Sequence, residues 1–487
     1  MRKFRILYLA PALALIALMA WALAAPVGSS PDDDFHLASI WCANSANTSA
    51  CEAGPTAAER VVPPAVHYSS CYARDPGKSA ACEDFYLNQG SKPSVVTDRG
   101  SFQNNYPPLY YATMSVFVGS DIATSVVVMR LINILLLVGI TTALFLLLPT
   151  RRRPVLLWGW IVSVVPLGSF LIASNNPSSW ALIGIGSAWI ALLGYFETGG
   201  RRKIALGALF ALAALMAAGA RGDAALYVVL SVVVVAILTF SKTRGYLLNS
   251  ILPVVLSAVA VMLFFSSQQS TVVATGLGSS GDAAGGAPVS TLNLIVKNLM
   301  NVPQLWAGAL GTWGLGWLDT AMPAIVSFGG IVAFVGIVLV GLSRLSHRKA
   351  AALLLVALAL WLLPTYVLVK GMNEVGQNVQ PRYLLPLMIL FAGLAVFDVG
   401  PGRFRLTRAQ LYPIVGLLAV GQSVALYMNM RRYITGTGSH GISLDANIEW
   451  WWNIVISPMT VWVVGSVAFA ALLIILVREM SKIDAIE

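Results

Sequence analysis

The sequence predicts an all-α polytopic membrane protein, and three observations lead to this fold class. Of the 487 residues, 57% are hydrophobic and only 11% are charged, whereas about a quarter of an ordinary soluble domain is charged. The mean hydropathy is +0.76. The apolar residues gather in long stretches with short basic segments between them. This composition excludes a water-soluble enzyme, a nucleic-acid-binding domain and a disordered chain.

A membrane helix needs about 20 apolar residues to cross roughly 30 Å of hydrocarbon. We expect about twelve such helices, beginning near Ile6, Ser125, Val155, Trp180, Ile204, Ala224, Leu247, Met322, Ala350, Leu384, Leu411 and Ile454. The first apolar stretch is longer than the core of most signal peptides, so we expect a retained helix. The chain then divides into a first transmembrane helix (1–25), an extracytoplasmic loop or cap (26–120), helices 2–7 (121–265), a second extracytoplasmic loop with an interfacial helix (266–321), and helices 8–12 with a short cytoplasmic tail (322–487).

The basic residues set the expected orientation. Most of the 31 Lys and Arg residues lie in the short segments 2–5, 151–153, 201–203, 242–244, 344–349, 403–408 and 478–482. Basic segments next to membrane helices stay in the cytoplasm. Both termini are therefore expected on the cytoplasmic side of the plasma membrane and both long loops on its extracytoplasmic side. The net charge of +10 is therefore a topology signal. The lipid bilayer is the expected partner, and nucleic acid is not.

Four cysteines lie in the first outside loop, and they are the only ones in the chain: Cys42, Cys51, Cys71 and Cys82. An even number on the oxidising side of the membrane predicts two disulfides, and three pairings are open. No Cys-x-x-Cys pair is present, so a zinc site is disfavoured. We expect a folded, disulfide-stapled cap.

The strongest local signal is the acidic sequence 30–36 (SPDDDFH), just beyond the first expected helix. Crowded carboxylates beside an imidazole can supply a general base, so Asp32, Asp33 and His36 are the candidate catalytic residues. No metal site is predicted with certainty, although Asp32 and Asp33 could hold a divalent cation. The alternative is a solvated turn that caps a helix starting near Asp34.

Cationic side chains at the outer ends of other helices form a second group of candidates. Arg382, with Tyr383 beside it, can form paired hydrogen bonds with a phosphate, and Arg221 can bind an anionic head group. Each has a structural alternative: Arg382 can extend to the membrane surface, and Arg221 can pair with Asp223. Arg130 lies within a span, where we expect it to pair with a carboxylate or with backbone carbonyls.

An acidic cluster and several cations on one side of the membrane suit group transfer from an anionic lipid. Nucleotides are scarce there, and no Gly-x-x-x-x-Gly-Lys loop is present. The donor is therefore expected to be a lipid-linked phosphate.

Five short motifs carry a family resemblance: 31–36 (PDDDFH), 107–111 (PPLYY), 176–177 (NP), 314–319 (GLGWLD) and 381–386 (PRYLLP). In their order and their placement relative to the spans, the chain resembles a large family of bacterial multi-pass membrane proteins of unassigned function. That family is grouped with the GT-C class of polyprenyl-phosphate-dependent glycosyltransferases. The family usually has Asp-Glu where this chain has Asp32 and Asp33, and Lys where it has Arg221. The stapling cysteines are not a general family feature.

The resemblance implies a GT-C-like fold with a catalytic carboxylate in the first outside loop. Asp32 or Asp33 then deprotonates the acceptor, which is a cell-envelope glycan, lipid or protein, and His36 orients the carboxylate or contacts the acceptor. Arg382, Tyr383 and Arg221 bind the phosphate of a polyprenyl-phosphate-linked sugar donor. The remaining motif residues line the substrate cavity: Tyr110, Asn176, Trp317 and Asp319.

Two alternatives stay open from the sequence. Twelve spans also suit a lipid or solute transporter or flippase, although such proteins often bury charges near the bilayer midplane. A glycan polymerase or ligase would depend on outside cations instead of an aspartate base. Its candidates are His440, Arg431 and Arg432 on the last outside loop.

Overall fold

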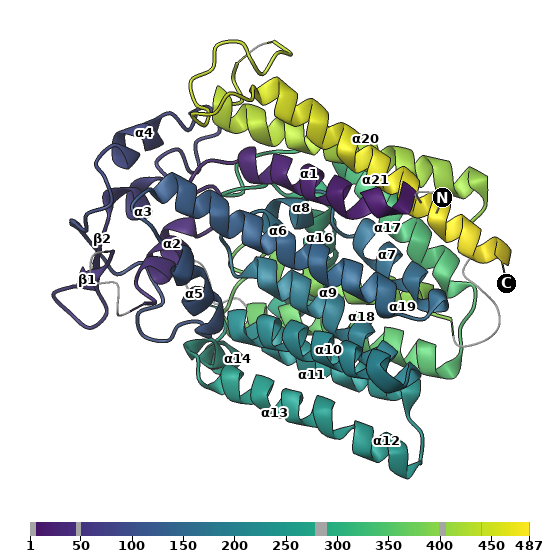
Figure 1. Ribbon diagram of the computed structural model, residues 1–487. Helices are drawn as coiled ribbons and strands as arrows, with labels where there is room; N and C mark the ends of the chain where they lie inside the picture. The colour runs from purple at the N-terminus through teal and green to yellow at the C-terminus, as the bar shows by residue number, and fades with distance from the viewer. Residues whose placement is uncertain (1–5, 45–49, 278–289, 399–405, 440, 487) are drawn as a thin grey trace.

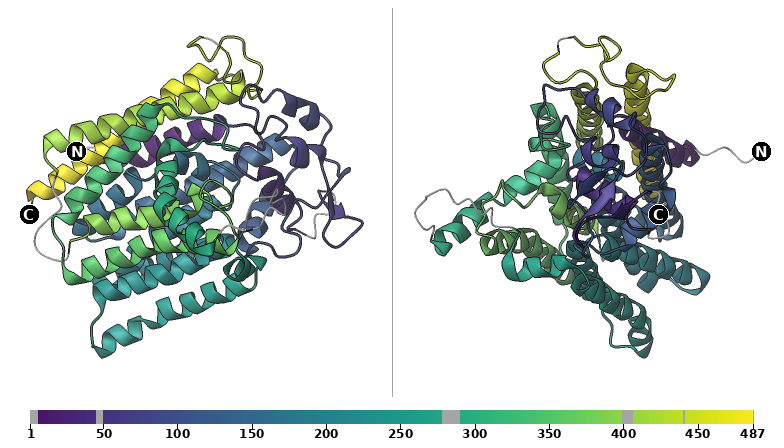
Figure 2. Two further views of the ribbon diagram at one scale, coloured as in Figure 1. Left: turned by 180° about the vertical axis from the view of Figure 1, so that it is seen from behind. Right: turned by 90° about the vertical axis from the view of Figure 1, so that its left-hand side faces the viewer.

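The computed structural model describes residues 6–44, 50–277, 290–398, 406–439 and 441–486. The chain is 69% helical, and its long helices run side by side through one bundle (Figure 1). The first long loop forms a cap at one end of this bundle. The start of the first helix and the end of the last lie together at the opposite end, as the views in Figures 1 and 2 agree.

Ten helices are long and apolar enough to cross a membrane within the described residues. The expected number of about twelve is therefore too high. The ten are Ile6–Leu23 (containing α1, Ala10–Leu23), α6 (Ile122–Leu147), α9 (Ser178–Glu197), α10 (Gly200–Ala220), α11 (Gly222–Thr239), Arg244–Phe265 (containing α12, Arg244–Asn249, and α13, Ile251–Phe265), α17 (Ala324–Leu342), α18 (His347–Lys370), α20 (Arg408–Ile434) and α21 (Pro458–Ile486).

Two of the twelve expected spans are not among these ten long helices, and each has a physical reason. The stretch near Val155 is broken into α7 (Arg153–Ile161) and α8 (Leu167–Ile172), because Pro166 lacks the amide hydrogen that a continuous helix needs. The stretch near Leu384 forms α19 (Pro381–Val396), which has 16 residues and so is only about 24 Å long. Nearly all of α19 is buried, so it forms part of the bundle centre.

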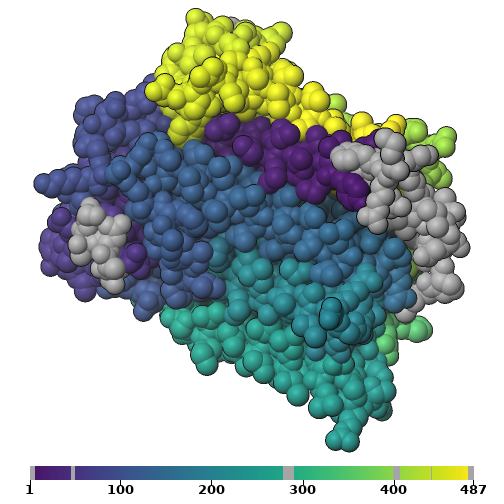
Figure 3. All heavy atoms as spheres, viewed as in Figure 1, coloured from purple at the N-terminus to yellow at the C-terminus, as the bar shows by residue number. Residues whose placement is uncertain are grey.

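Close helix approach in the bundle depends on small residues. A Cβ atom on Gly184 of α9 would lie 2.5 Å from the carbonyl oxygen of Ala213 and 2.7 Å from the Cβ of Ala217, both on α10. Membrane helices associate through such small-residue contacts because lipid provides little hydrophobic driving force. On the molecular surface, α1 lies between α21 and α6 (Figure 3).

The cap contains a small sheet, so the all-α prediction holds only for the rest of the described chain. Its three strands are antiparallel in the order β1-β2-β3, and Val62 pairs with Val95. The disulfides join neighbouring cysteines, Cys42 to Cys51 and Cys71 to Cys82. The elements of the cap are α2 (Asp33–Trp41), β1 (Glu52–Ala53), β2 (Arg60–Val62), α3 (Pro64–Tyr68), α4 (Cys82–Leu87), β3 (Val95–Thr97), α5 (Leu109–Met114) and η2 (Ser115–Phe117).

The second long loop is also largely helical. Its helix α15 (Thr291–Asn301) exposes Leu292, Val296 and Met300, the amphipathic pattern expected of an interfacial helix. On the other face, the Asn298 side chain donates to the carbonyl of Asn373 and accepts from the amide of Val375. The remaining short helices are η3 (Thr150–Arg152) between α6 and α7, and, in this loop, η4 (Gln268–Thr271), α14 (Val272–Thr275), α16 (Pro303–Ala307) and η5 (Gly308–Thr312).

The end of α1 is fixed by side chains from other helices, because the last carbonyls of a helix have no partners within it. Arg130 of α6 donates to the carbonyls of Ala22 (2.9 Å), Ala25 (2.5 Å) and Pro26 (2.6 Å). This confirms the expectation that Arg130 pairs with backbone carbonyls. Asn429 of α20 donates to the carbonyl of Ala24 at 2.9 Å. The chain therefore leaves α1 on a fixed path into the acidic sequence.

Replacing Asn429 with Leu tests this anchoring. We expect the free energy of unfolding to fall by about 1 kcal/mol, because the buried Ala24 carbonyl loses its donor. The measurement is the midpoint of thermal unfolding of the detergent-solubilised protein. The control is Tyr412→Phe, at an exposed site on the same helix. A midpoint for Asn429→Leu at or above that of the wild type would contradict the anchoring role.

Candidate functional site

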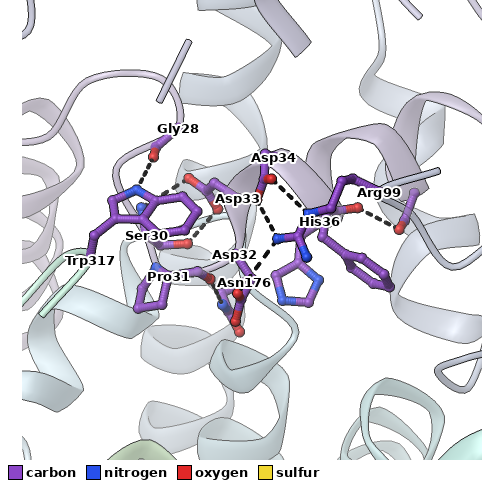
Figure 4. Close-up of polar contacts among 12 residues, drawn as sticks. Gly28, Ser30, Pro31, Asp32, Asp33, Asp34, His36, Arg99, Asn176 and Trp317 are labelled. Atoms are coloured by element: carbon purple, nitrogen blue, oxygen red, sulfur yellow. Dashed lines mark hydrogen bonds and ion pairs between the residues drawn. The ribbon is translucent and has the colours of Figure 1, made fainter. Parts of the chain in front are cut away.

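The acidic sequence forms a tight turn between α1 and α2. Asp32 precedes the first residue of α2 and has a φ of 62°, a left-handed conformation that Asp tolerates better than most residues. Residues held in sparsely populated conformations cluster at functional sites. From this turn the Asp33 carboxylate points toward Ser30, whereas those of Asp32 and Asp34 both lie near Arg99 (Figure 4).

Asp33 faces the interior of the turn. Its side chain is fully buried and accepts hydrogen bonds from the amide (3.0 Å) and the hydroxyl of Ser30. Burial raises the pKa of Asp33 to about 6. No contact joins Asp33 to Arg221 or Arg382 in the described structure, so its carboxylate maintains the turn.

Asp34 pairs with an arginine that the sequence did not single out. The Arg99 guanidinium donates to both oxygens of Asp34, at 2.9 and 3.0 Å. A second nitrogen of Arg99 lies 3.8 Å from Asp32. Arg99 is 65 residues from Asp34 in a cap loop, and no spacing pattern in the sequence relates the two.

Asp32 is the carboxylate that faces the helical bundle. Its Oδ2 lies 2.6 Å from Nη2 of Arg382, and its side chain is 40% exposed. Partial burial favours the neutral acid, but the charge of Arg382 and its hydrogen bond outweigh this effect and hold the pKa of Asp32 below its usual value. Asp32 is therefore an ionised carboxylate at neutral pH.

Two arginines and a tyrosine lie on the side of Asp32 that faces the bundle. Arg382 is the second residue of α19, is nearly fully buried and donates to the Pro31 carbonyl at 3.2 Å. Its Nε is buried and has no hydrogen-bond partner within the described residues. The ring of Tyr383 lies between two cations, with its centroid 4.6 Å from the Arg221 guanidinium carbon and 5.3 Å from that of Arg382. We call Arg221, Tyr383 and Arg382 the arginine–tyrosine stack.

Arg221 connects α10 to α11 and has local partners. It makes two hydrogen bonds of 2.9 Å to Asp223, the internal ion pair that was the alternative interpretation from the sequence. A third contact, 3.4 Å long, reaches the hydroxyl of Ser178. Arg221 is thus positioned by Asp223 while its guanidinium covers Tyr383.

His36 is buried among aromatic rings. Its Nδ1 lies 2.9 Å from the Tyr111 hydroxyl, whereas its Nε2 is buried with no hydrogen-bond partner in the described structure. The rings of Phe35 and Tyr106 contact it edge-on. Burial lowers the pKa of His36 to about 3, so the imidazole is neutral at physiological pH.

The neutral state of His36 predicts a pH dependence of stability. Between about pH 3 and the unfolded-state value near 6.5, the unfolded chain binds a proton at this position and the folded chain does not. Stability due to His36 therefore increases with pH across this window and is lost as the pH falls. We expect thermal unfolding of His36→Gln to be less acid-sensitive than that of the wild type between pH 7 and pH 4.

The difference between the two proteins is the quantity to measure, because Asp33 contributes with the opposite sign. Its pKa is raised to about 6 in the folded chain, so its contribution to stability decreases as the pH rises from about 4 to 6. Parallel pH profiles for wild type and His36→Gln would contradict a neutral, buried His36.

The four residues expected to line a substrate cavity have the following surroundings in the structure. Asn176 donates to the Pro31 carbonyl and Trp317 to the Gly28 carbonyl, both at 2.9 Å (Figure 4). Tyr110 is fully buried. The Asp319 carboxylate accepts from Arg432 at 2.8 Å. Asn176 and Trp317 therefore support the acidic turn and the residues that lead into it.

A small hollow of about 20 Å³ opens next to the turn. It reaches Arg382 and the loop before α17, and its lining includes Pro31, Gly314, Gly316, Gln380 and Arg382. No group of three or more His, Cys, Asp or Glu side chains is arranged to hold a metal ion in the described parts of the chain. A cation shared by Asp32 and Asp33 would require Asp33 to leave Ser30.

The cations of the polymerase or ligase alternative have structural partners. Arg432 is fully buried and binds the carbonyls of Tyr72 and Lys78 in the cap. Arg431 binds the Tyr427 hydroxyl and the carbonyls of two residues that follow α20. His440 lies outside the described residues.

Comparison with protein families identifies one match. The model of a family described as "Predicted membrane protein (DUF2142)" matches residues 15–391. This region includes the acidic turn, the disulfide-bonded cap and the arginine–tyrosine stack, and it ends before Arg431 and Arg432. Comparison with curated proteins and with solved structures gave no match.

Proposed function

The chain belongs to the DUF2142 family of predicted membrane proteins, and from that premise we propose that it is a GT-C-like membrane glycosyltransferase. It would transfer a sugar from a polyprenyl-phosphate donor to a cell-envelope glycan, lipid or protein. One observation carries the proposal: the ionised Asp32 lies 2.6 Å from Arg382, at the edge of an arginine–tyrosine stack and beneath a disulfide-bonded cap. This arrangement would put the proposed base next to the proposed phosphate site.

The proposed step is a single displacement. The Asp32 carboxylate removes the proton from an acceptor hydroxyl, and the resulting oxygen attacks the anomeric carbon of the sugar. The bond between that carbon and the phosphate oxygen breaks, and polyprenyl phosphate leaves with the electron pair. Arg382 and Arg221 stabilise the negative charge that develops on the leaving phosphate.

Donor binding and base strength are coupled through Arg382. Without a donor, Arg382 keeps the pKa of Asp32 low, and so limits its proton affinity. A bound phosphate would compete with Asp32 for the Arg382 guanidinium, which would raise the proton affinity of the carboxylate when the donor is in place. The neutral His36, whose Nε2 has no hydrogen-bond partner among the described residues, would orient the carboxylate or contact the acceptor.

The distribution of charge supports an extracytoplasmic site in the plasma membrane. The basic segments 151–153, 201–203 and 344–349 connect helices at the end of the bundle opposite the cap, where α1 begins and α21 ends (Figure 1). By the positive-inside rule, that end faces the cytoplasm and the cap faces outward. The disulfides of the cap agree with an oxidising compartment.

The test uses the purified full chain in detergent with decaprenyl-phosphate-linked glucose, mannose and arabinofuranose, each supplied with total cell-envelope extract as acceptor. The expected result is release of decaprenyl phosphate from one of the donors, measured by mass spectrometry. A donor that binds but is never cleaved would contradict transfer. Movement of the uncleaved donor across proteoliposomes would indicate a flippase instead.

A further inference from the structure

An apolar groove lies in the half of the bundle away from the cap. It runs between α1, α6, α7 and α21 and has a volume of about 300 Å³, the lower end of the range for ligand sites. Its lining is almost entirely apolar and includes Ala14 and Leu18 of α1, Val138 and Phe145 of α6, Leu157 of α7 and Leu473 of α21.

The position of the groove determines which molecules can reach it. Three of its four walls are helices that can cross a membrane, so a lipid chain is the available apolar occupant. The groove shares no lining residue with the hollow next to Arg382. It is therefore separate from the proposed donor site, and the inference below does not depend on the proposed function.

A basic side chain lies next to one of the residues that line the groove. Arg153 begins α7, and its guanidinium carbon lies 4.7 Å from the ring centroid of Phe145, which lines the groove. The Arg153 Nε is buried and has no hydrogen-bond partner within the described residues.

The neighbouring arginines already have partners. Arg151 and Arg152 both pair with Glu197, and Arg202 donates to the carbonyls of Leu147 and Leu148. Arg153 therefore has a buried Nε next to the groove that makes no hydrogen bond within the described residues, and the acidic influence on its charge comes from Glu479.

We propose that this groove binds an anionic phospholipid, with an acyl chain between α1 and α6 and the phosphate at Arg153. An arginine close to a membrane surface attracts anionic lipids, and the groove supplies the apolar surface for the chain. The lipid belongs to the leaflet at the end of the bundle opposite the cap. The site joins α1 to α21, the two ends of the chain.

The experiment measures lipid retained by the purified full chain with dioleoyl phosphatidylglycerol as the probe. Native mass spectrometry should show one tightly held lipid in the wild type. Ala14→Phe fills the groove and should lose this lipid. The matched control is Ala12→Phe, because Ala12 is exposed on the same helix and does not line the groove. Equal retention by Ala14→Phe and Ala12→Phe would overturn the proposal.

A second variant tests the head group without altering the groove. Arg153→Gln should reduce the preference for phosphatidylglycerol over dioleoyl phosphatidylcholine by about fivefold. A wild type that retains both lipids equally would overturn the anionic assignment. Displacement of the bound lipid by decaprenyl phosphate at equal concentration would assign the groove to the donor and would also overturn the proposal.

Discussion

Replacement of Asp32 by Asn is expected to reduce sugar transfer by about 10²–10⁴-fold, the usual contribution of a positioned base. The amide has the size of the carboxylate but cannot accept the proton of the acceptor hydroxyl. Donor binding should change little, because the donor phosphate provides Arg382 with a new anionic partner. The measurements are release of decaprenyl phosphate and, separately, the dissociation constant for the donor.

Substitutions at two other aspartates serve as comparisons for Asp32→Asn. Asp98→Asn changes an exposed residue of the same cap and should leave transfer at the wild-type rate. Asp33→Asn removes a carboxylate that is held by Ser30, so it should affect stability more than donor binding. Wild-type transfer by Asp32→Asn would exclude Asp32 as the base, and joint loss of transfer and donor binding would indicate a structural role.

The sequence predicts most of the helical part of the fold because the length of an apolar stretch determines whether it can span a membrane. Its errors also have physical causes. Pro166 interrupts the stretch near Val155, and an apolar count alone does not detect this break. The helix at Pro381–Val396 is apolar because protein surrounds it, and burial in protein and burial in lipid select the same residues.

The candidate site was predictable as a region but not as a set of contacts. The sequence identified an acidic turn and two arginines, and the structure brings Asp32 to Arg382. It could not decide which carboxylate faces the arginines, because that depends on the left-handed backbone of Asp32. Arg99 was missed because its partner Asp34 is distant in sequence. The pairing of the four cysteines was open because four cysteines allow three pairings, and the sequence does not show which of them the folded cap brings within bonding distance.

The largest expected effect on stability comes from Arg432→Gln. Arg432 is fully buried at the end of α20 and binds three groups in two segments: the Asp319 carboxylate at 2.8 Å, and the carbonyls of Lys78 and Tyr72 in the cap at 2.6 and 2.8 Å. Removing one partner of a buried ion pair leaves the other charge uncompensated. We expect the free energy of unfolding to fall by about 3–5 kcal/mol, measured by denaturant titration in detergent.

The neighbouring arginine provides a matched control for this effect. Arg431 is also largely buried, but it has no carboxylate partner in the described structure and binds a hydroxyl and carbonyls of the loop after α20. Arg431→Gln should therefore destabilise the protein by less than Arg432→Gln. If Asp319→Asn is destabilised as strongly as Arg432→Gln, the ion pair dominates. If Asp319→Asn has the same free energy of unfolding as the wild type, the cap carbonyls account for most of the effect. Equal, small losses of stability in both arginine variants would contradict the central role of Arg432 in holding the cap on the bundle.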